Sequence, residues 1–203
     1  GLTLPHTGAD LRYRPPLIPL YLCGIHYKYE HEMTTIRPKK ALGQHFLIDD
    51  SIAARIADTL ADYRGRPVLE VGPGTGVLTR HLLAAGHDLS VVEIDPASIS
   101  FLRAHYPALE GRILDEDFLQ MDLRARYPSD FMVIGNYPYY ISSQIFFKVL
   151  EERDRVVCCS GMIQKEVAER LAARPATRTA GILSALIQPW YDVEYLFTVP
   201  PSA

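Results

Sequence analysis

The stretch that decides the fold reads PVLEVGPGTGVLTRHLLAAG and covers residues 67–86. Its first five residues, Pro67–Val71, have the pattern of a short apolar strand, and three glycines follow at alternate positions. Val77–Ala85 then has the composition of a helix that ends at Gly86. Glycine lets the backbone turn tightly and approach a ligand closely, and this turn opens onto a helix N-terminus. The stretch predicts a strand, a ligand-binding turn and a helix.

Strands and helices alternate along the rest of the chain. Further strands are predicted at Leu89–Ile94, Arg112–Leu114, Phe131–Gly135, Arg155–Ser160 and Val193–Val199. Helices are predicted after Asp49 or Asp50, at Pro96–His105, at Ile141–Leu150 and at Gln164–Ala173. Nearly continuous apolar strands joined by helices are typical of a parallel sheet that is covered on both faces. We therefore expect one main domain with an α/β, doubly wound, Rossmann-like fold.

Residues 1–32 lack the regular pattern that begins at Met33. We interpret them as a non-native or flexible N-terminal extension ahead of a natural start at Met33, with a genuine flexible arm as the alternative. Residues 33–203 would then form the domain. The apolar run Leu17–Ile25 is interrupted by Pro19 and is far shorter than the ~20 residues of a membrane span. It also lacks the flanks of a signal peptide, so a soluble protein is expected.

Charge and cysteine usage exclude some classes of site. The formal net charge is −3, so no global positive field attracts a polyanion. A local basic cluster remains possible as a grip on nucleic acid, or as an ordinary solvated surface; its members are Arg37, Lys39, Lys40, Arg55, Arg64 and Arg66. The three cysteines have no CxxC spacing, which argues against a zinc site and a disulfide framework. No metal is expected, and a reducing cytoplasm fits best.

Two acidic positions indicate a nucleoside-bearing ligand. The glycine turn has the spacing GxGxG rather than the GxGxxG of dinucleotide folds. Glu93 ends the next predicted strand, where a carboxylate can accept hydrogen bonds from both hydroxyls of a ribose. Asp117 follows the third strand at the same sheet edge, where it could accept the amino group of an adenine, and Phe118 offers an apolar ring face.

The most specific motif is Asn136-Tyr137-Pro138-Tyr139, directly after the fourth strand. An adenine amine is a poor nucleophile because its lone pair is delocalised into the ring. The Asn136 side-chain oxygen and the Tyr137 backbone carbonyl could hold its two hydrogens. Pro138 restricts the backbone, and Tyr139 can stack on an extruded base. Such a site orients the amine for attack on an activated methyl group, without a strong general base.

Several motifs occur in the order found in the rRNA adenine N6-dimethyltransferases, which this chain resembles from Arg37 to Ala203. They are GQHFL at residues 43–47, the glycine turn at 70–76, Glu93, Asp117, Asn136–Tyr139 and QKEVA at 164–168. Within this superfamily the chain is similar to the small-subunit branch whose loss gives kasugamycin resistance.

The resemblance implies the cofactor S-adenosyl-L-methionine and a set of residues that hold it: Gln44, His45, Leu47, Gly72, Gly74, Gly76, Glu93, Asp117, Phe118 and Asn136. It implies catalytic roles for Asn136–Tyr139. The implied enzyme dimethylates two adjacent adenosines near the 3′ end of small-subunit (16S) rRNA during ribosome biogenesis. The expected partner is this RNA within a pre-ribosomal particle, the expected state is a monomer, and the expected location is the cytoplasm.

Two departures from the family pattern stand out. Tyr137 occupies a position that is commonly Leu, which should affect packing more than chemistry. The family also continues into a seventh strand and a small helical domain, so we expect a sheet that is truncated after Val193–Val199, with unpaired backbone on Val156–Ser160. Two alternatives remain: a large-subunit adenine methyltransferase of the macrolide-resistance type, and a non-catalytic RNA-binding assembly factor on the same fold.

Overall fold

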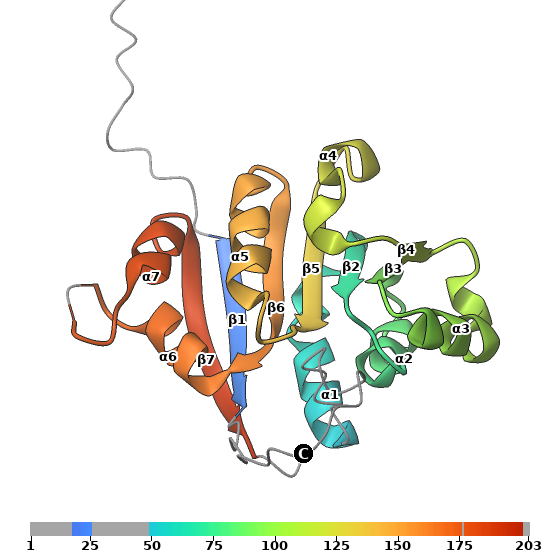
Figure 1. Cartoon of the computed structure of the whole chain (residues 1–203), viewed down its shortest axis with the longest axis horizontal. Helices are drawn as coiled ribbons and strands as arrows, with labels where there is room; N and C mark the ends of the chain where they lie inside the picture. Colours follow the sequence, from blue (N-terminus) through green and yellow to red (C-terminus); the bar gives the residue numbers. More distant parts are fainter. Residues whose placement is uncertain (1–17, 26–48, 176, 201–203) are drawn as a thin grey trace, which may run out of the picture.

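A computed structural model describes residues 18–25, 49–175 and 177–200. They form a seven-stranded sheet with the order β4-β3-β2-β5-β6-β1-β7, in which all neighbours are parallel (Figure 1). The strands are β1 (Ile18–Ile25), β2 (Pro67–Val71), β3 (Asp88–Glu93), β4 (Ile113–Asp115), β5 (Phe131–Asn136), β6 (Val156–Gln164) and β7 (Tyr191–Val199). The predicted α/β, doubly wound fold is confirmed.

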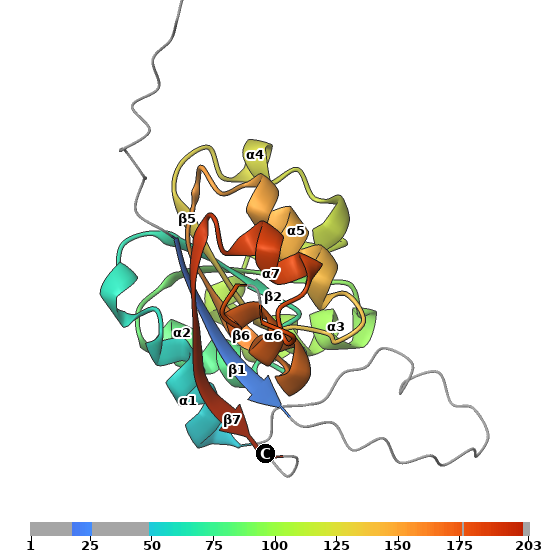
Figure 2. The same ribbon diagram turned by 90° about the vertical axis from the view of Figure 1, so that its left-hand side faces the viewer.

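Helices cover both faces of the sheet (Figure 2). The α-helices are α1 (Asp50–Asp58), α2 (Val77–Ala84), α3 (Pro96–His105), α4 (Leu123–Arg126), α5 (Ser142–Glu151), α6 (Lys165–Ala172) and α7 (Ile182–Ile187). Single 3₁₀ turns are η2 (Ala61–Tyr63), η3 (Pro107–Leu109) and η4 (Phe118–Gln120). Buried residues of α1, α2 and α3 belong to one core cluster, and those of α4, α5, α6 and α7 to the other. Each strand therefore buries side chains on both faces, as a parallel sheet requires.

Short polar signals fix where the helices begin. Asp49 precedes α1, and its carboxylate accepts the backbone N–H of Ser51 at 2.9 Å. Asp95 precedes α3 and accepts the N–H of Ser98 at 2.9 Å, while Pro96 occupies the first turn. A side-chain oxygen that accepts one of the unpaired N–H groups in the first turn stabilises a helix by about 1 kcal/mol. The Asp95 cap lies in the loop between β3 and α3, at the carboxyl edge of the sheet.

Strand β1 overturns two expectations from the sequence. It lies between β6 and β7 and pairs with both, so Val156–Ser160 is not an unpaired edge and β7 does not lack a partner (Figure 1). Leu20 and Leu22 face one core cluster, whereas Cys23 and Ile25 face the other. Ile18–Ile25 is therefore part of the core, although the sequence pattern of residues 1–32 was interpreted as a non-native or flexible extension. The predicted domain boundary at Met33 lies outside the described residues.

Two further elements of the structure differ from those predicted from the sequence. β6 continues to Gln164, beyond the predicted end at Ser160, and Ile182–Ile187 forms a helix that was not expected. The Ser184 hydroxyl donates to the Gly181 carbonyl at 2.8 Å, and the Gly181 N–H donates to the Ser184 oxygen at 3.1 Å, which together fix the start of this helix. Among the described residues, no helix has the length and apolar character needed to cross a membrane.

Candidate cofactor and methyl-transfer site

The glycine turn after β2 has the left-handed backbone that its composition predicts. Gly72, Gly74 and Gly76 have φ values of 67°, 56° and 84°. Among the described residues, nothing lies within 4 Å of a Cβ atom placed on Gly72, so this part of the turn leaves room for a ligand. A Cβ atom on Gly76 would lie 2.6 Å from the Tyr106 ring, whose hydroxyl donates to the Gly76 carbonyl at 2.9 Å. Gly72 thus leaves room for a ligand, and Gly76 admits the tyrosine that supports the turn.

Glu93 joins the end of β3 to this glycine turn. One carboxylate oxygen accepts the backbone N–H groups of Ile94 at 2.8 Å and Asp95 at 2.9 Å. The other oxygen accepts the N–H of Gly74 at 3.1 Å. The side chain is only 3% exposed, so these three donors compensate for lost hydration. A carboxylate has about four acceptor positions, and Glu93 therefore keeps capacity for a ligand hydroxyl.

A second buried acid, Glu70, lies one strand away at the carboxyl end of β2. It is 1% exposed, and its carboxylate accepts the Thr79 hydroxyl at 2.7 Å. Burial raises the pKa of Glu70 to about 8; the Thr79 hydrogen bond opposes this shift, and the neighbouring charge of Glu93 adds to it. Within the described part of the chain, the site therefore contains one acid that accepts three backbone N–H groups and one that accepts a single hydroxyl.

Apolar surface and an acid follow β4 at the same edge. Asp117 precedes η4 and accepts the N–H of Leu119 at 2.9 Å. Phe118 is buried, whereas Ile94 is 59% exposed and lies on the same pocket wall. An exposed isoleucine and a buried phenylalanine offer apolar contacts to a flat ring, and the carboxylate offers an acceptor for an amino group.

The segment that follows β5 turns sharply into α5. The backbone N–H of Tyr137 donates to the Met162 carbonyl on β6 at 3.0 Å, and the N–H of Ile141 donates to the Pro138 carbonyl at 3.2 Å. The Tyr139 and Tyr140 rings meet edge to face with centroids 5.8 Å apart. This turn therefore presents Asn136 and the backbone that follows it at the carboxyl edge of the sheet.

One pocket unites most of the predicted site. Its lining includes the predicted residues Gly72, Gly74, Glu93, Asp117, Phe118, Asn136, Tyr137 and Pro138. Gly76 and Tyr139 do not line it, although both lie in segments that do. Gln44, His45 and Leu47 lie outside the described residues, as do the basic residues Arg37, Lys39 and Lys40. The geometry thus brings together the ends of β2, β3, β4 and β5, as the sequence predicted.

Tyr140 was not predicted as a site residue, yet it lines the pocket, whereas the predicted Tyr139 does not. Tyr140 is 50% exposed. Partial burial and the nearby carboxylates of Asp117 and Glu93 raise the pKa of its hydroxyl. The only signal in the sequence was a second aromatic residue beside the motif, and the side of the turn that each ring takes depends on backbone geometry. Glu70, Ile94 and Ile141 also line the pocket without having been predicted.

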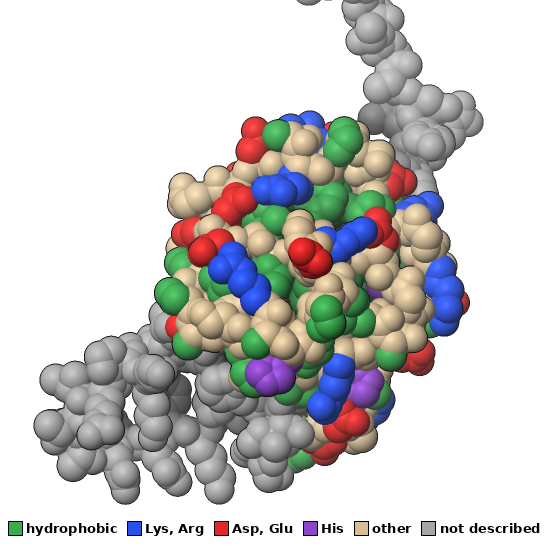
Figure 3. Space-filling view, turned by 90° about the vertical axis from the view of Figure 1, so that its right-hand side faces the viewer, with side chains coloured by type: hydrophobic (Ala, Val, Ile, Leu, Met, Phe, Trp, Pro, Cys, Tyr) green, Lys and Arg blue, Asp and Glu red, His purple; other side chains and the backbone are tan. Residues whose placement is uncertain are grey.

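The predicted basic residues within the described part of the chain form no continuous basic surface for nucleic acid. The Arg55 guanidinium stacks on the Phe197 ring, 3.6 Å from its centroid, and Arg66 lies 3.9 Å from the Asp130 carboxylate. On the face that carries α2 and α3, positive and negative side chains alternate over the surface (Figure 3). The local basic cluster that the sequence suggested therefore stays a prediction that depends largely on undescribed residues.

Comparison with known proteins supports a single family. Residues 36–203 match the family described as ribosomal RNA adenine dimethylase. The chain is 65% identical over 167 residues to ribosomal RNA small subunit methyltransferase A of Parabacteroides distasonis, covering 82% of this chain and 63% of the relative. The relative of the same name in Porphyromonas gingivalis is 56% identical over 172 residues, covering 84% of this chain and 67% of the relative. The chain therefore spans roughly two thirds of the length of these relatives.

Solved structures agree with this result. A dimethyladenosine transferase from Plasmodium falciparum superposes with a TM-score of 0.59 at 28% identity, covering 71% of this chain and 52% of that one. The 23S rRNA methyltransferase ErmE superposes with a TM-score of 0.56 at 29% identity, covering 73% of this chain and 66% of that one. With its motifs gathered around one pocket and a family match over residues 36–203, the chain belongs to the ribosomal RNA adenine dimethylase family.

Proposed function

We propose that this chain carries the cofactor and methyl-transfer site of an rRNA adenine N6-dimethyltransferase that acts on two adjacent adenosines near the 3′ end of small-subunit (16S) rRNA. The observation that carries the proposal is the convergence of Glu93, Asp117 and Asn136 on one pocket beside an open glycine turn. These residues follow different strands, so their convergence at one edge of the sheet supports a ligand-binding site rather than three unrelated polar positions.

The pocket fits S-adenosyl-L-methionine. Glu93 keeps acceptor capacity for ribose hydroxyls, and the open space at Gly72 admits a ligand close to the backbone. Ile94 and Phe118 supply apolar contacts for an adenine ring, and Asp117 supplies an acceptor for its amino group. When bound, this cofactor supplies an electrophilic methyl group on a sulfonium sulfur. Gln44, His45 and Leu47 belong to the proposed binding set through the resemblance, and so does Gly76, which supports the turn from outside the pocket.

Asn136 and the turn after it are proposed to hold the target amine. The Asn136 side-chain oxygen and the Tyr137 backbone carbonyl would each accept one N6–H, which leaves the nitrogen lone pair free to point at the methyl group. Pro138 limits the motion of this backbone, and Tyr139, which does not itself line the pocket, is proposed to stack on the extruded base. The amine loses its proton to solvent after transfer, so these residues orient the reactants rather than act as a strong base.

The similarity pattern favours a small-subunit substrate over the alternatives. The relatives that are 51–65% identical bear the small-subunit name, whereas the 23S enzyme is 29% identical. The intact Asn136–Tyr139 motif argues against a non-catalytic assembly factor. We further propose a monomer that meets its rRNA in a pre-ribosomal particle in the cytoplasm.

Two measurements test the proposal. Calorimetry with S-adenosyl-L-methionine should give saturable binding to this chain, and primer extension across small-subunit rRNA should stop at two adjacent adenosines after incubation with the protein and cofactor. Stops in large-subunit rRNA would favour the macrolide-resistance alternative. Cofactor binding without stops in either RNA would favour the assembly factor, and absence of cofactor binding would refute the proposal.

A further inference from the structure

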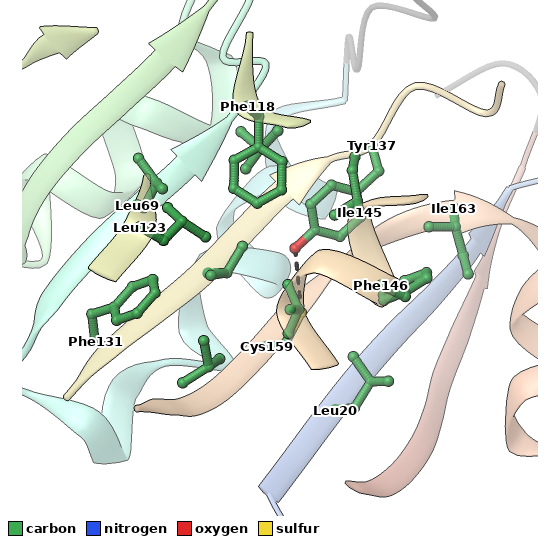
Figure 4. Packing of buried hydrophobic residues seen from close by; sticks show 14 of the residues in the cluster. Leu20, Leu69, Phe118, Leu123, Phe131, Tyr137, Ile145, Phe146, Cys159 and Ile163 are labelled. Atoms are coloured by element: carbon green, nitrogen blue, oxygen red, sulfur yellow. Dashed lines mark hydrogen bonds between the residues drawn. The ribbon is translucent and has the colours of Figure 1, made fainter. Parts of the chain in front are cut away.

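The side chain of Tyr137 occupies a closed slot beneath the candidate site. It is 1% exposed and is among the largest fully buried side chains. Its ring meets the Phe146 ring of α5 edge to face, with centroids 5.8 Å apart and an interplanar angle of 74° (Figure 4). The residue thus contributes its backbone to the pocket wall and its side chain to the core.

Two glycines on neighbouring strands make this slot possible. A Cβ atom on Gly161 of β6 would lie 2.4 Å from the Tyr137 ring, and one on Gly135 of β5 would lie 3.0 Å from it. Any side chain at Gly161 would also meet the Gly135 carbonyl at 2.3 Å. The ring therefore lies where two strands lack side chains, and it has little freedom to move.

The hydroxyl of Tyr137 fastens the inner end of this side chain to β6. It donates to the Ser160 carbonyl at 2.7 Å and lies 3.5 Å from the Cys159 sulfur (Figure 4). The backbone N–H of Tyr137 donates to the Met162 carbonyl of the same strand at 3.0 Å. Burial raises the pKa of this hydroxyl well above its usual value, so it remains a donor. Two bonds to one strand thus fix the residue at both ends.

We propose that Tyr137 is a positioning residue whose side chain sets the turn that presents Asn136 and the Tyr137 carbonyl. This inference rests on the proposed function, which assigns those two acceptors to the target amine. Small errors in the placement of reacting groups cost large factors in rate. The buried hydroxyl is therefore expected to affect turnover, although it touches neither substrate nor cofactor.

Tyr137→Phe removes only the hydroxyl and keeps the ring in its slot. Tyr191→Phe is a matched control, because Tyr191 is also a buried tyrosine whose hydroxyl donates to a backbone carbonyl, that of Val149, at 3.1 Å. Tyr191 does not line the pocket. Both variants should lose a comparable amount of thermal stability, since each removes one buried hydrogen bond from a tyrosine hydroxyl to a backbone carbonyl.

Two readouts at a temperature where all proteins are folded separate positioning from stability. Hydrogen exchange at residues 137–141 should quicken in Tyr137→Phe and stay at the wild-type rate in Tyr191→Phe. Methyl transfer to unmodified small-subunit particles should show a kcat reduced on the order of tenfold in Tyr137→Phe, with a nearly unchanged KM for the cofactor.

The outcomes are distinct. Wild-type exchange at residues 137–141 in Tyr137→Phe, or a kcat no lower than that of Tyr191→Phe, would overturn the inference. If the wild-type protein transfers no methyl group, the proposed function fails, and the exchange measurement alone still decides whether the hydroxyl holds the turn. Faster exchange together with reduced kcat in Tyr137→Phe would support both the positioning role of Tyr137 and the proposed function.

Discussion

Replacing the buried carboxyl of Glu70 with an amide should make the protein more stable at alkaline pH. The pKa of Glu70 rises from 4.5 to about 8 in the folded state, mainly because burial penalises the charged form. The folded protein therefore holds this proton more tightly than the unfolded chain does. The stabilising contribution is complete below about pH 4.5, declines as the pH rises towards about 8, and is absent above it.

The size of the effect follows from the two pKa values. Each pH unit between them costs about 1.4 kcal/mol, so ionisation of Glu70 destabilises the folded state by roughly 3–5 kcal/mol at pH 8. Glu70→Gln keeps an oxygen that can accept the Thr79 hydroxyl and carries no charge at any pH. A change of this size corresponds to a shift on the order of 10 °C in Tm for a chain of this length.

Thermal unfolding of both proteins from pH 5 to pH 9 measures the difference directly. The wild-type Tm should fall relative to that of Glu70→Gln between pH 5 and pH 8, and the difference should level off above that range. Glu110→Gln is the matched control, because it makes the same chemical change at an exposed position. Parallel curves for the wild type and Glu70→Gln would refute the assignment of a buried, protonated carboxyl.

Four further predictions concern the pocket and β1. Glu93→Ala should weaken cofactor binding about tenfold or more by calorimetry, since it removes ribose acceptors and loosens the glycine turn; unchanged affinity would contradict the assignment. Asn136→Ala should lower kcat far more than RNA affinity, and near-native turnover would show that another group holds the amine. Tyr140→Ala should reduce cofactor affinity several-fold, whereas Tyr139→Ala should reduce turnover alone; equal cofactor affinities for the two variants would argue against their separate roles. A chain that begins at Met33 should lose on the order of 10 °C in Tm because it lacks the buried side chains of β1; an unchanged Tm would show that β1 contributes no stability.

The sequence predicted the strands that carry the pocket because local chemistry marks their ends. Glycines follow β2, the acid Glu93 ends β3, and Asn136 ends β5. In a parallel sheet the carboxyl ends of the strands share one edge, so residues at strand ends meet even when they are distant in sequence. The convergence of Glu93, Asp117 and Asn136 could therefore be anticipated without coordinates.

The position of β1 could not be predicted in the same way. Its partners β6 and β7 lie more than a hundred residues away, as the pairing of Leu20 with Cys159 and Val193 illustrates. The run Leu17–Ile25 is too short for a membrane span and lacks the flanks of a signal peptide. A short apolar run also fits a strand that is buried on both faces, but periodicity alone does not separate that strand from other buried segments. The pairing of β1 with β6 and β7 makes this segment a strand of the sheet.

Side-chain direction within the turn after β5 was equally beyond the sequence. Tyr137, Tyr139 and Tyr140 are chemically alike, yet the first is buried in the core, the second lies outside the pocket lining and the third lines the pocket. The burial of Tyr137 depends on Gly135 and Gly161, which belong to two different strands. A pattern within one segment carries no information about such a slot.

The two buried acids of the pocket differ in what surrounds them, and this difference suits each to a separate task. Glu93 receives three backbone N–H groups, which can balance an ionised carboxylate inside the protein. Among the described residues, Glu70 receives a side-chain hydrogen bond from the Thr79 hydroxyl alone, and it lies close to the charge of Glu93, so protonation is the less costly state for it. If both were ionised, the two carboxylates would repel each other within one pocket. A neutral Glu70 avoids this repulsion, so the pocket can hold two buried acids while Glu93 accepts the backbone N–H groups that surround it.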